Sequence, residues 1–155
     1  MQDLPEAGPA FDKNTPAELR PRVSFMAHDF FNPQPVQADI YMIKLILHDW
    51  PDVESIKILR GLVPAMRPGS KVLFIDYVGK QDSAQGDEQK EELPRSIVQM
   101  GTATDLRMMA LFNAEERPVE AWKEIFKQAD ERFEITRVEA NPLTFYVVLE
   151  AVWRS

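Results

Sequence analysis

The sequence ADIYMIKLILHDW, residues 38–50, decides the fold of this chain. Residues 38–47 are apolar at both alternating positions for most of their length, which is typical of a strand buried on both faces of a parallel sheet. The stretch continues into His48, and Asp76 closes the next apolar run along the chain. Open α/β sheets bind their ligands where neighbouring strands end. The pattern therefore predicts an imidazole base and a carboxylate that orients it at one sheet edge.

The rest of the chain alternates between expected helices and strands, which indicates the α/β class. Apolar steps of three and four residues predict helices, and short apolar runs predict strands. The helices are expected at 52–66, 96–112 and 118–129, and the strands at 1–4, 23–27, 71–78, 133–138 and 143–152. The last two strands are expected to pair antiparallel because their connection is short. The sheet is otherwise expected to be parallel.

Two segments are expected to have little regular structure. Pro5, Gly8, Pro9 and Pro16 interrupt a potential helix between the first two strands, and proline breaks a helix interior. The charged residues 80–93 contain Gly, Ser and Gln, a composition typical of a flexible surface loop.

The composition fits a single domain over residues 1–155 and disfavours several functions. Of the 155 residues 45% are hydrophobic, enough to bury roughly two thirds of the unfolded surface. A formal net charge of −7 disfavours nucleic acid and anionic membranes as partners. The sequence has no cysteine and only two histidines, so we expect no disulfide and no metal site. Without a signal-like start or a bilayer-spanning apolar run, we expect a cytoplasmic protein.

Five motifs occur in an order that resembles one enzyme family. They are MQDLPE at 1–6, RVSF through HDFF at 22–31, KLILHDW at 44–50, RPGS at 67–70 and NAEER at 113–117. Together they resemble the S-adenosylmethionine-dependent O-methyltransferases of plant and fungal secondary metabolism, and in particular the fungal polyketide-modifying branch. The resemblance extends over nearly the whole chain and corresponds to the C-terminal part of the family's usual length. It implies a partial Rossmann-like methyltransferase fold.

The resemblance implies S-adenosylmethionine as the cofactor and assigns four residues to it. Asp3 falls where the family uses an acidic residue to accept hydrogen bonds from the cofactor ribose, a role that suits an ionised carboxylate. Asp29 and Phe30 match the pair that meets the adenine, the first at its exocyclic amine and the second on its ring. Lys44 matches a lysine beside the cofactor.

The resemblance also implies the catalytic and substrate-binding residues. His48 matches the catalytic base, and Asp76 and Glu116 match the two acidic residues that flank it. Met109 and Asn113 fall where the family lines the pocket for its small aromatic or polyketide-like acceptor. These residue types suit the chemistry, because a phenol with a pKa near 10 is protonated at neutral pH and needs a base. An imidazole can take that proton if a carboxylate stabilises the resulting cation.

Each motif also has a purely structural interpretation. His48, Asp49 and Trp50 suit a helix-entry turn, while Asp3 and Asp29 are common strand-end residues with solvated side chains. The segment around Glu116 suits an acidic helix start, which the helix dipole favours. Lys44 can lie along the sheet with its amine in water, and methionines such as Met109 often fill a core. Only Asp76, at the end of an apolar strand, resists such an explanation.

Two parts of the family's pattern are missing from the sequence. The family's first sheet strand and its glycine-rich turn, which binds the methionine part of the cofactor, have no counterpart here, nor has its N-terminal helical portion. In the family that strand lies between the second and fourth strands. We therefore expect strands 1–4 and 23–27 to be separated from strands 38–47 and 71–78. The central strand of the sheet is then expected to have unpaired hydrogen-bonding groups on one side. Such an edge predicts association into homo- or hetero-oligomers.

The sequence leaves three functions open. The first is methyl transfer to a phenolic or enolic hydroxyl of a polyketide-like metabolite. The second is a truncated homologue without independent activity. The third is a non-catalytic partner that regulates or completes another methyltransferase through its exposed sheet edge.

Overall fold

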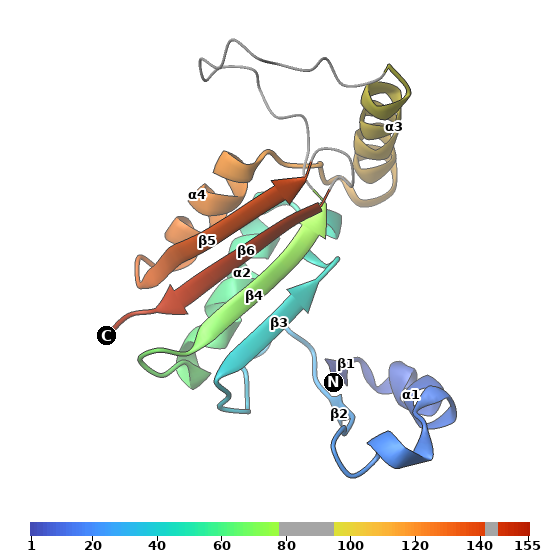
Figure 1. Ribbon diagram of the computed structural model, residues 1–155, viewed down its shortest axis with the longest axis vertical. Coiled ribbons are helices and arrows are strands. Elements are labelled where there is room, and N and C mark those ends of the chain that lie inside the picture. Colours follow the sequence, from blue (N-terminus) through green and yellow to red (C-terminus); the bar gives the residue numbers. More distant parts are fainter. Residues whose placement is uncertain (78–94, 142–145) are drawn as a thin grey trace.

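The computed structural model describes residues 1–77, 95–141 and 146–155. A four-stranded sheet with helices packed on it forms the main body, and a smaller N-terminal unit has a two-stranded sheet of its own (Figure 1). The loop expected at 80–93 and the start of the strand expected at 143–152 lie outside the described residues. No helix in the described ranges is both long and apolar enough to cross a bilayer.

The N-terminal unit is built from two short parallel strands, β1 (Gln2–Asp3) and β2 (Met26–Ala27). Between them lie the short helices η1 (Pro5–Ala7) and η2 (Ala17–Leu19) on either side of α1 (Gly8–Asn14). The expectation that the prolines would disrupt a helix here was wrong. Pro9 lies in the first turn of α1, where the amide hydrogen that proline lacks has no helical partner anyway.

The main sheet has the order β3-β4-β6-β5. Its strands are β3 (Ile40–Lys44), β4 (Lys71–Tyr77), β5 (Phe133–Asn141) and β6 (Tyr146–Trp153). Strands β3 and β4 are parallel, whereas β6 is antiparallel to both β4 and β5. This confirms the antiparallel C-terminal pair. The separation of β1 and β2 from β3 and β4 is confirmed as well.

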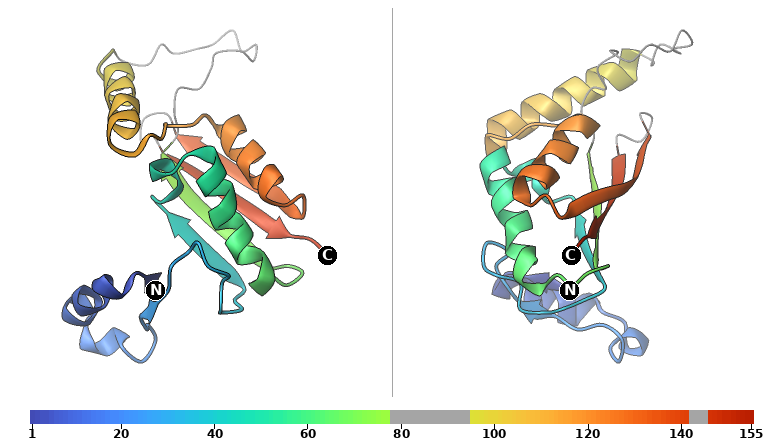
Figure 2. Two further views of the ribbon diagram at one scale, coloured as in Figure 1. Left: turned by 180° about the vertical axis from the view of Figure 1, so that it is seen from behind. Right: turned by 90° about the vertical axis from the view of Figure 1, so that its left-hand side faces the viewer.

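Helices α2 (Asp52–Leu62) and α4 (Val119–Ala129) cover one face of this sheet (Figure 2). The short helix η4 (Val63–Ala65) continues α2, and α3 (Arg95–Phe112) stands beyond the end to which β4 points (Figure 1). The core lies between the sheet and the two covering helices. Its fully buried members include Leu59, Phe74, Trp122, Phe126 and Leu149.

Strand β3 was expected to be buried on both faces, and this was wrong. The side chains of Ile40 and Met42 are 59% and 62% exposed, whereas Tyr41 between them is buried. Alternate residues of a strand point to opposite faces, and α2 and α4 cover only one of them. Among the described strands β3 pairs only with β4, so its other edge is open as expected.

Candidate active site

His48 lies in η3 (Leu47–Asp49), a short helix that connects the end of β3 to α2. The chain turns sharply at Leu45, which has a φ of 54° and donates its backbone N–H to Ile75 of β4 at 2.9 Å. A positive φ is unusual for a bulky residue and is often found at functional sites. The turn leaves Leu47 fully buried and His48 only 7% exposed. The imidazole is therefore largely shielded from solvent.

Asp76 attaches this turn to β4. Its carboxylate is fully buried, and Oδ2 accepts the backbone N–H groups of Leu47 at 3.1 Å and His48 at 3.3 Å. Oδ1 accepts the N–H of Tyr77 at 2.8 Å. Burial raises the pKa of Asp76 to about 6, although His48 and the backbone N–H groups act in the opposite direction. The predicted contact between the ends of the two strands is thus present.

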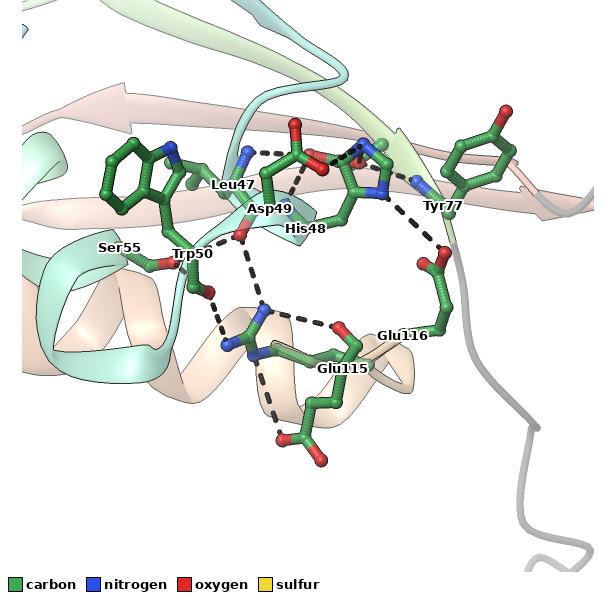
Figure 3. Close-up of polar contacts among 10 residues, drawn as sticks. Leu47, His48, Asp49, Trp50, Ser55, Tyr77, Glu115 and Glu116 are labelled. Carbon is green, nitrogen blue, oxygen red and sulfur yellow. Dashed lines mark hydrogen bonds and ion pairs between the residues drawn. The ribbon is translucent and has the colours of Figure 1, made fainter. Parts of the chain in front are cut away.

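Carboxylates face both nitrogens of the His48 ring. Nε2 lies 3.6 Å from Oδ1 of Asp49 and 4.0 Å from Oδ1 of Asp76, while Nδ1 lies 3.6 Å from Oε1 of Glu116. His48 and Glu116 point toward each other across the site (Figure 3). Burial alone would lower the pKa of His48, but Glu116, Asp76 and Asp49 outweigh it and raise the pKa above 6.5. The site therefore favours the protonated imidazole.

Within the part of the chain that the structure describes, three buried atoms of this cluster have no hydrogen-bond partner: Nδ1 of His48 and both carboxylate oxygens of Glu116. Separations of 3.6 Å or more are those of ion pairs and are too long for hydrogen bonds. Buried polar groups are normally satisfied, and exceptions often mark a catalytic role or a ligand. The arrangement can thus accept a proton on the imidazole and stabilise the resulting charge from two sides.

Sequence reasoning missed two neighbours of this cluster. The ring of Tyr77 lies 5.0 Å from the imidazole of His48 and stacks on Tyr146 at 5.1 Å. A hydrogen bond with Tyr146 and burial raise the pKa of Tyr77 above 10.0. Arg117, only 1% exposed, contacts the turn that carries His48. In the sequence Tyr77 follows Asp76 and Arg117 follows Glu116. This adjacency was the signal that could have identified them as neighbours of the site.

The residues assigned to the cofactor lie at the carboxyl ends of β1, β2 and β3. Asp3 ends β1 and Lys44 ends β3, both with exposed side chains. Asp29 follows β2 and accepts the N–H of Phe31 at 2.9 Å. Phe30 packs edge-on against Trp50, with 5.9 Å between ring centroids. Because Trp50 is two residues from His48, this contact joins the proposed adenine side to the proposed base.

Met109 and Asn113, the residues assigned to the acceptor, lie in the last turn of α3 and directly after it. Met109 is 60% exposed, and Asn113 is exposed with a φ of 52°. Neither has a described contact with His48, so their role stays a prediction. Helix α3 nevertheless contacts η3, and the backbone N–H of Glu116 donates to Asp105 of α3 at 3.0 Å.

Comparison with known proteins identifies the family of this chain. The O-methyltransferase domain family matches residues 1–131. The chain belongs to this family. The fungal O-methyltransferase lcsG of Purpureocillium lilacinum is 42% identical over 156 residues, which cover 100% of this chain and 32% of that protein. The chain thus spans about a third of the length of the curated relatives it matches.

Solved structures of other proteins share the fold. The structure of LepI in complex with SAM is 26% identical, with a TM-score of 0.78 over 99% of this chain and 35% of that one. The O-methyltransferase NcsB1 from neocarzinostatin biosynthesis, with S-adenosylhomocysteine and 1,4-dihydroxy-2-naphthoic acid, is 25% identical. Its TM-score is 0.74 over 98% of this chain and 40% of that one. The partial Rossmann-like α/β fold expected from the sequence is therefore confirmed.

Proposed function

We propose that this chain carries the catalytic base and part of the cofactor site of an O-methyltransferase. The reaction is methyl transfer from S-adenosylmethionine to a phenolic or enolic hydroxyl of a small polyketide-like metabolite. One observation carries the proposal: the buried imidazole of His48 lies at the end of β3 with Glu116 facing one ring nitrogen and Asp76 facing the other. This environment raises the pKa of His48, which makes the neutral imidazole a stronger base for the hydroxyl proton.

The residues around His48 suit the removal of a hydroxyl proton. A phenolic oxygen is mostly protonated at neutral pH and is a weak nucleophile in that form. As His48 takes the proton, its new positive charge lies between Glu116 on the Nδ1 side and Asp76 and Asp49 on the Nε2 side. Asp76 is already fixed by three backbone N–H groups. The charge therefore meets a preorganised site that needs little rearrangement.

The ends of β1 and β2 support the binding of S-adenosylmethionine. The exposed carboxylate of Asp3 suits hydrogen bonds from ribose hydroxyls, and Asp29 suits the adenine amine. Phe30 offers an aromatic surface held by Trp50, and Lys44 lies at the end of β3. When bound, the cofactor supplies an electrophilic methyl group on a sulfonium centre.

Less specific observations support the chemical class of the acceptor and the cellular location of the protein. Related fungal proteins are named O-methyltransferases, one of them from a grayanic acid biosynthesis cluster, and the NcsB1 structure holds a dihydroxynaphthoic acid. These observations support a small aromatic hydroxyl compound as acceptor. The family resemblance, and no contact in the structure, assigns Met109 and Asn113 to its pocket. The acidic, cysteine-free composition supports a cytoplasmic location.

A methyl-transfer assay tests this proposal. It uses the natively expressed protein, which means the protein as its own gene and host produce it. Isotope-labelled S-adenosylmethionine is incubated with a panel of phenolic and enolic aromatic compounds, and the products are analysed by mass spectrometry. We expect label in a methyl ether, and none when the hydroxyl of the same acceptor is already methylated. Cofactor binding without labelled product from any hydroxyl acceptor would contradict the proposed activity.

A second candidate function follows from the edge of β3 that no described strand covers. The chain could act as a non-catalytic partner that binds another methyltransferase through this edge, because unpaired strand edges readily accept a further strand. The two functions differ in their need for His48. A His48→Asn variant that supports a partner's activity as well as the wild-type chain does would favour the partner role.

A further inference from the structure

Arg117 is an almost completely buried arginine next to Glu116. We propose that it is a positioning residue that sets the distance between Glu116 and the imidazole of His48. The inference rests on the proposed function of His48 as base. It assigns to Arg117 no contact with the reacting groups, only the alignment of the two segments that carry them.

The guanidinium of Arg117 holds the turn that carries His48 from both ends. Nη2 donates to the backbone oxygen of Trp50 at 2.8 Å, and Nη1 lies 3.4 Å from that of Leu47. These two carbonyl groups flank His48 and Asp49. Nε donates to Oδ1 of Asp52, the first residue of α2, at 2.7 Å. One side chain therefore connects η3 and the start of α2 to the segment after α3.

The ring of Trp122 also holds the guanidinium of Arg117 in place. The guanidinium lies over this ring, with 4.8 Å between Cζ and the ring centroid. Trp122 is fully buried and donates its indole N–H to the backbone oxygen of Tyr77 at 3.1 Å. Since Asp76 precedes Tyr77, Arg117 is also indirectly tied to the end of β4. A planar guanidinium can make these contacts at once, whereas the ammonium of lysine cannot reproduce its fork geometry.

Glu116 depends on this support because no hydrogen bond from the described residues holds its carboxylate. Its carboxylate pairs with His48 at 3.6 Å, and the backbone on either side of Glu116 sets how closely it can approach the ring. On one side the N–H of Glu116 is held by Asp105 of α3 at 3.0 Å. On the other side the chain continues directly into Arg117. Loosening Arg117 would let Glu116 move relative to His48.

Arg117→Lys tests this inference because lysine keeps the positive charge and removes the fork. A change in the pKa of His48 then reports geometry, given that the other groups facing the ring, Asp49, Asp76 and Tyr77, are unchanged. In the natively expressed protein we expect kcat to fall by about 100-fold, the loss typical of a misplacement of roughly 1 Å. The pKa of His48, followed by NMR, should fall because Glu116 raises it. Cofactor affinity should stay within about threefold, since kcat and binding report different interactions.

Arg60→Lys is the matched control. Arg60 also binds two backbone carbonyl groups, those of Ala129 and Gln128 at 3.1 and 2.8 Å, but at the far end of α4. We expect this variant to keep the wild-type kcat and the wild-type pKa of His48. Wild-type values in Arg117→Lys, or the same losses in both variants, would overturn the positioning role.

Two further outcomes keep the test decisive. If Arg117→Lys shows no cooperative unfolding transition, Asp52→Ala removes the acceptor that binds the same guanidinium at Nε, and an unchanged kcat in that variant would overturn the inference. If the wild-type protein transfers no methyl group, the proposed function fails, yet the NMR comparison still shows whether Arg117 controls the surroundings of His48.

Discussion

Asp76 binds His48 twice, through the backbone and toward the ring. Its Oδ2 accepts the backbone N–H of His48 at 3.3 Å, and its Oδ1 lies 4.0 Å from Nε2 of the same residue. A single buried carboxylate thus fixes the turn that carries the imidazole and also acts to raise the pKa of the imidazole. This double contact explains why a carboxylate occupies the end of an otherwise apolar strand, where an unpaired charge would be costly.

His48→Asn should abolish methyl transfer and leave cofactor affinity nearly intact. Removal of a general base typically costs about 10²–10⁴-fold in rate, and no described contact joins His48 to Asp3, Asp29 or Phe30. Single-turnover kinetics and calorimetry on the natively expressed protein measure the two effects separately. His28→Asn is the control, because the described hydrogen bond of His28 is made by its backbone to Asp3. Unchanged turnover in His48→Asn would remove His48 as the base.

Glu116→Gln should move the acid limb of the pH profile of kcat/KM to lower pH. The base must be unprotonated in the free enzyme, and Glu116 contributes to the raised pKa of His48. A neutral amide removes that attraction, although Asp49 and Asp76 still act on the ring. Glu115→Gln changes the neighbouring carboxylate, which is 65% exposed and faces Arg117 instead, and should leave the limb in place. A limb that moves equally in both variants would point to a general charge effect.

The free energy of unfolding should decrease as pH rises from about 4 to about 7. The pKa of Asp76 is raised from 3.8 to about 6 by folding, so the folded state binds the proton more tightly. Its contribution is fully present below the unfolded pKa and is lost as pH rises through the folded one. At about 1.4 kcal/mol per pKa unit, the loss is at most about 3 kcal/mol. The raised pKa of His48 acts in the same direction above 6.5.

Urea denaturation of the natively expressed protein at several pH values measures this slope. Asp76→Asn carries no titratable group and should flatten the part of the slope below about pH 6. Its overall stability should be lower, because an amide cannot accept from all three backbone N–H groups that now bind the carboxylate. A wild-type stability that rises over the same interval would show that other groups dominate.

Local sequence patterns predicted the elements of the fold and the contact between His48 and Asp76. The strand ends are set by apolar runs, and neighbouring parallel strands bring their ends together. Two details of the fold escaped prediction. The exposed side chains of Ile40 and Met42 depend on which face the helices cover, and periodicity alone does not reveal this. The helix α1 formed because Pro9 falls in its first turn, a position that the count of prolines does not show.

The long-range part of the site could not be predicted from local patterns. Glu116 entered the site only through the family resemblance, because in isolation its segment resembles an ordinary helix start. Arg117 was missed since arginine is mostly exposed in proteins, and its burial follows from contacts with carbonyl groups far away in the sequence. The physical reason is general. Every residue has a backbone carbonyl group, so the residue types do not reveal which carbonyl groups of a turn need a hydrogen-bond donor.

Gly61→Ala should weaken cofactor binding more than it changes stability. Gly61 lies within α2, where alanine favours the helix by about 1 kcal/mol. A methyl group there would lie 3.0 Å from the backbone oxygen of Phe30 and 3.3 Å from that of Asn32, which must shift. Because Phe30 is the proposed adenine contact, we expect a higher dissociation constant for S-adenosylmethionine in calorimetry.

Gly69→Ala is the control for Gly61→Ala, because it should change stability and leave cofactor binding unchanged. Gly69 has a φ of +88°, and apart from its two chain neighbours no described residue has an atom within 4 Å of an added methyl group. The substitution should cost about 1–2 kcal/mol of stability through backbone strain alone and leave cofactor affinity unchanged. Equal cofactor affinity in Gly61→Ala and the wild type would contradict the proposed contact between Phe30 and the adenine.

The 155-residue chain expressed by itself should bind S-adenosylmethionine weakly or not at all. Its cofactor-side groups are Asp3, Asp29, Phe30 and Lys44, which suit the ribose and adenine part of the ligand. The resemblance places the methionine part on a glycine-rich turn, and the six glycines of this chain form no such cluster. A ligand held at one end loses the contacts that offset the entropy cost of binding. Calorimetry of the 155-residue chain tests this prediction, and micromolar affinity would show that these four residues suffice.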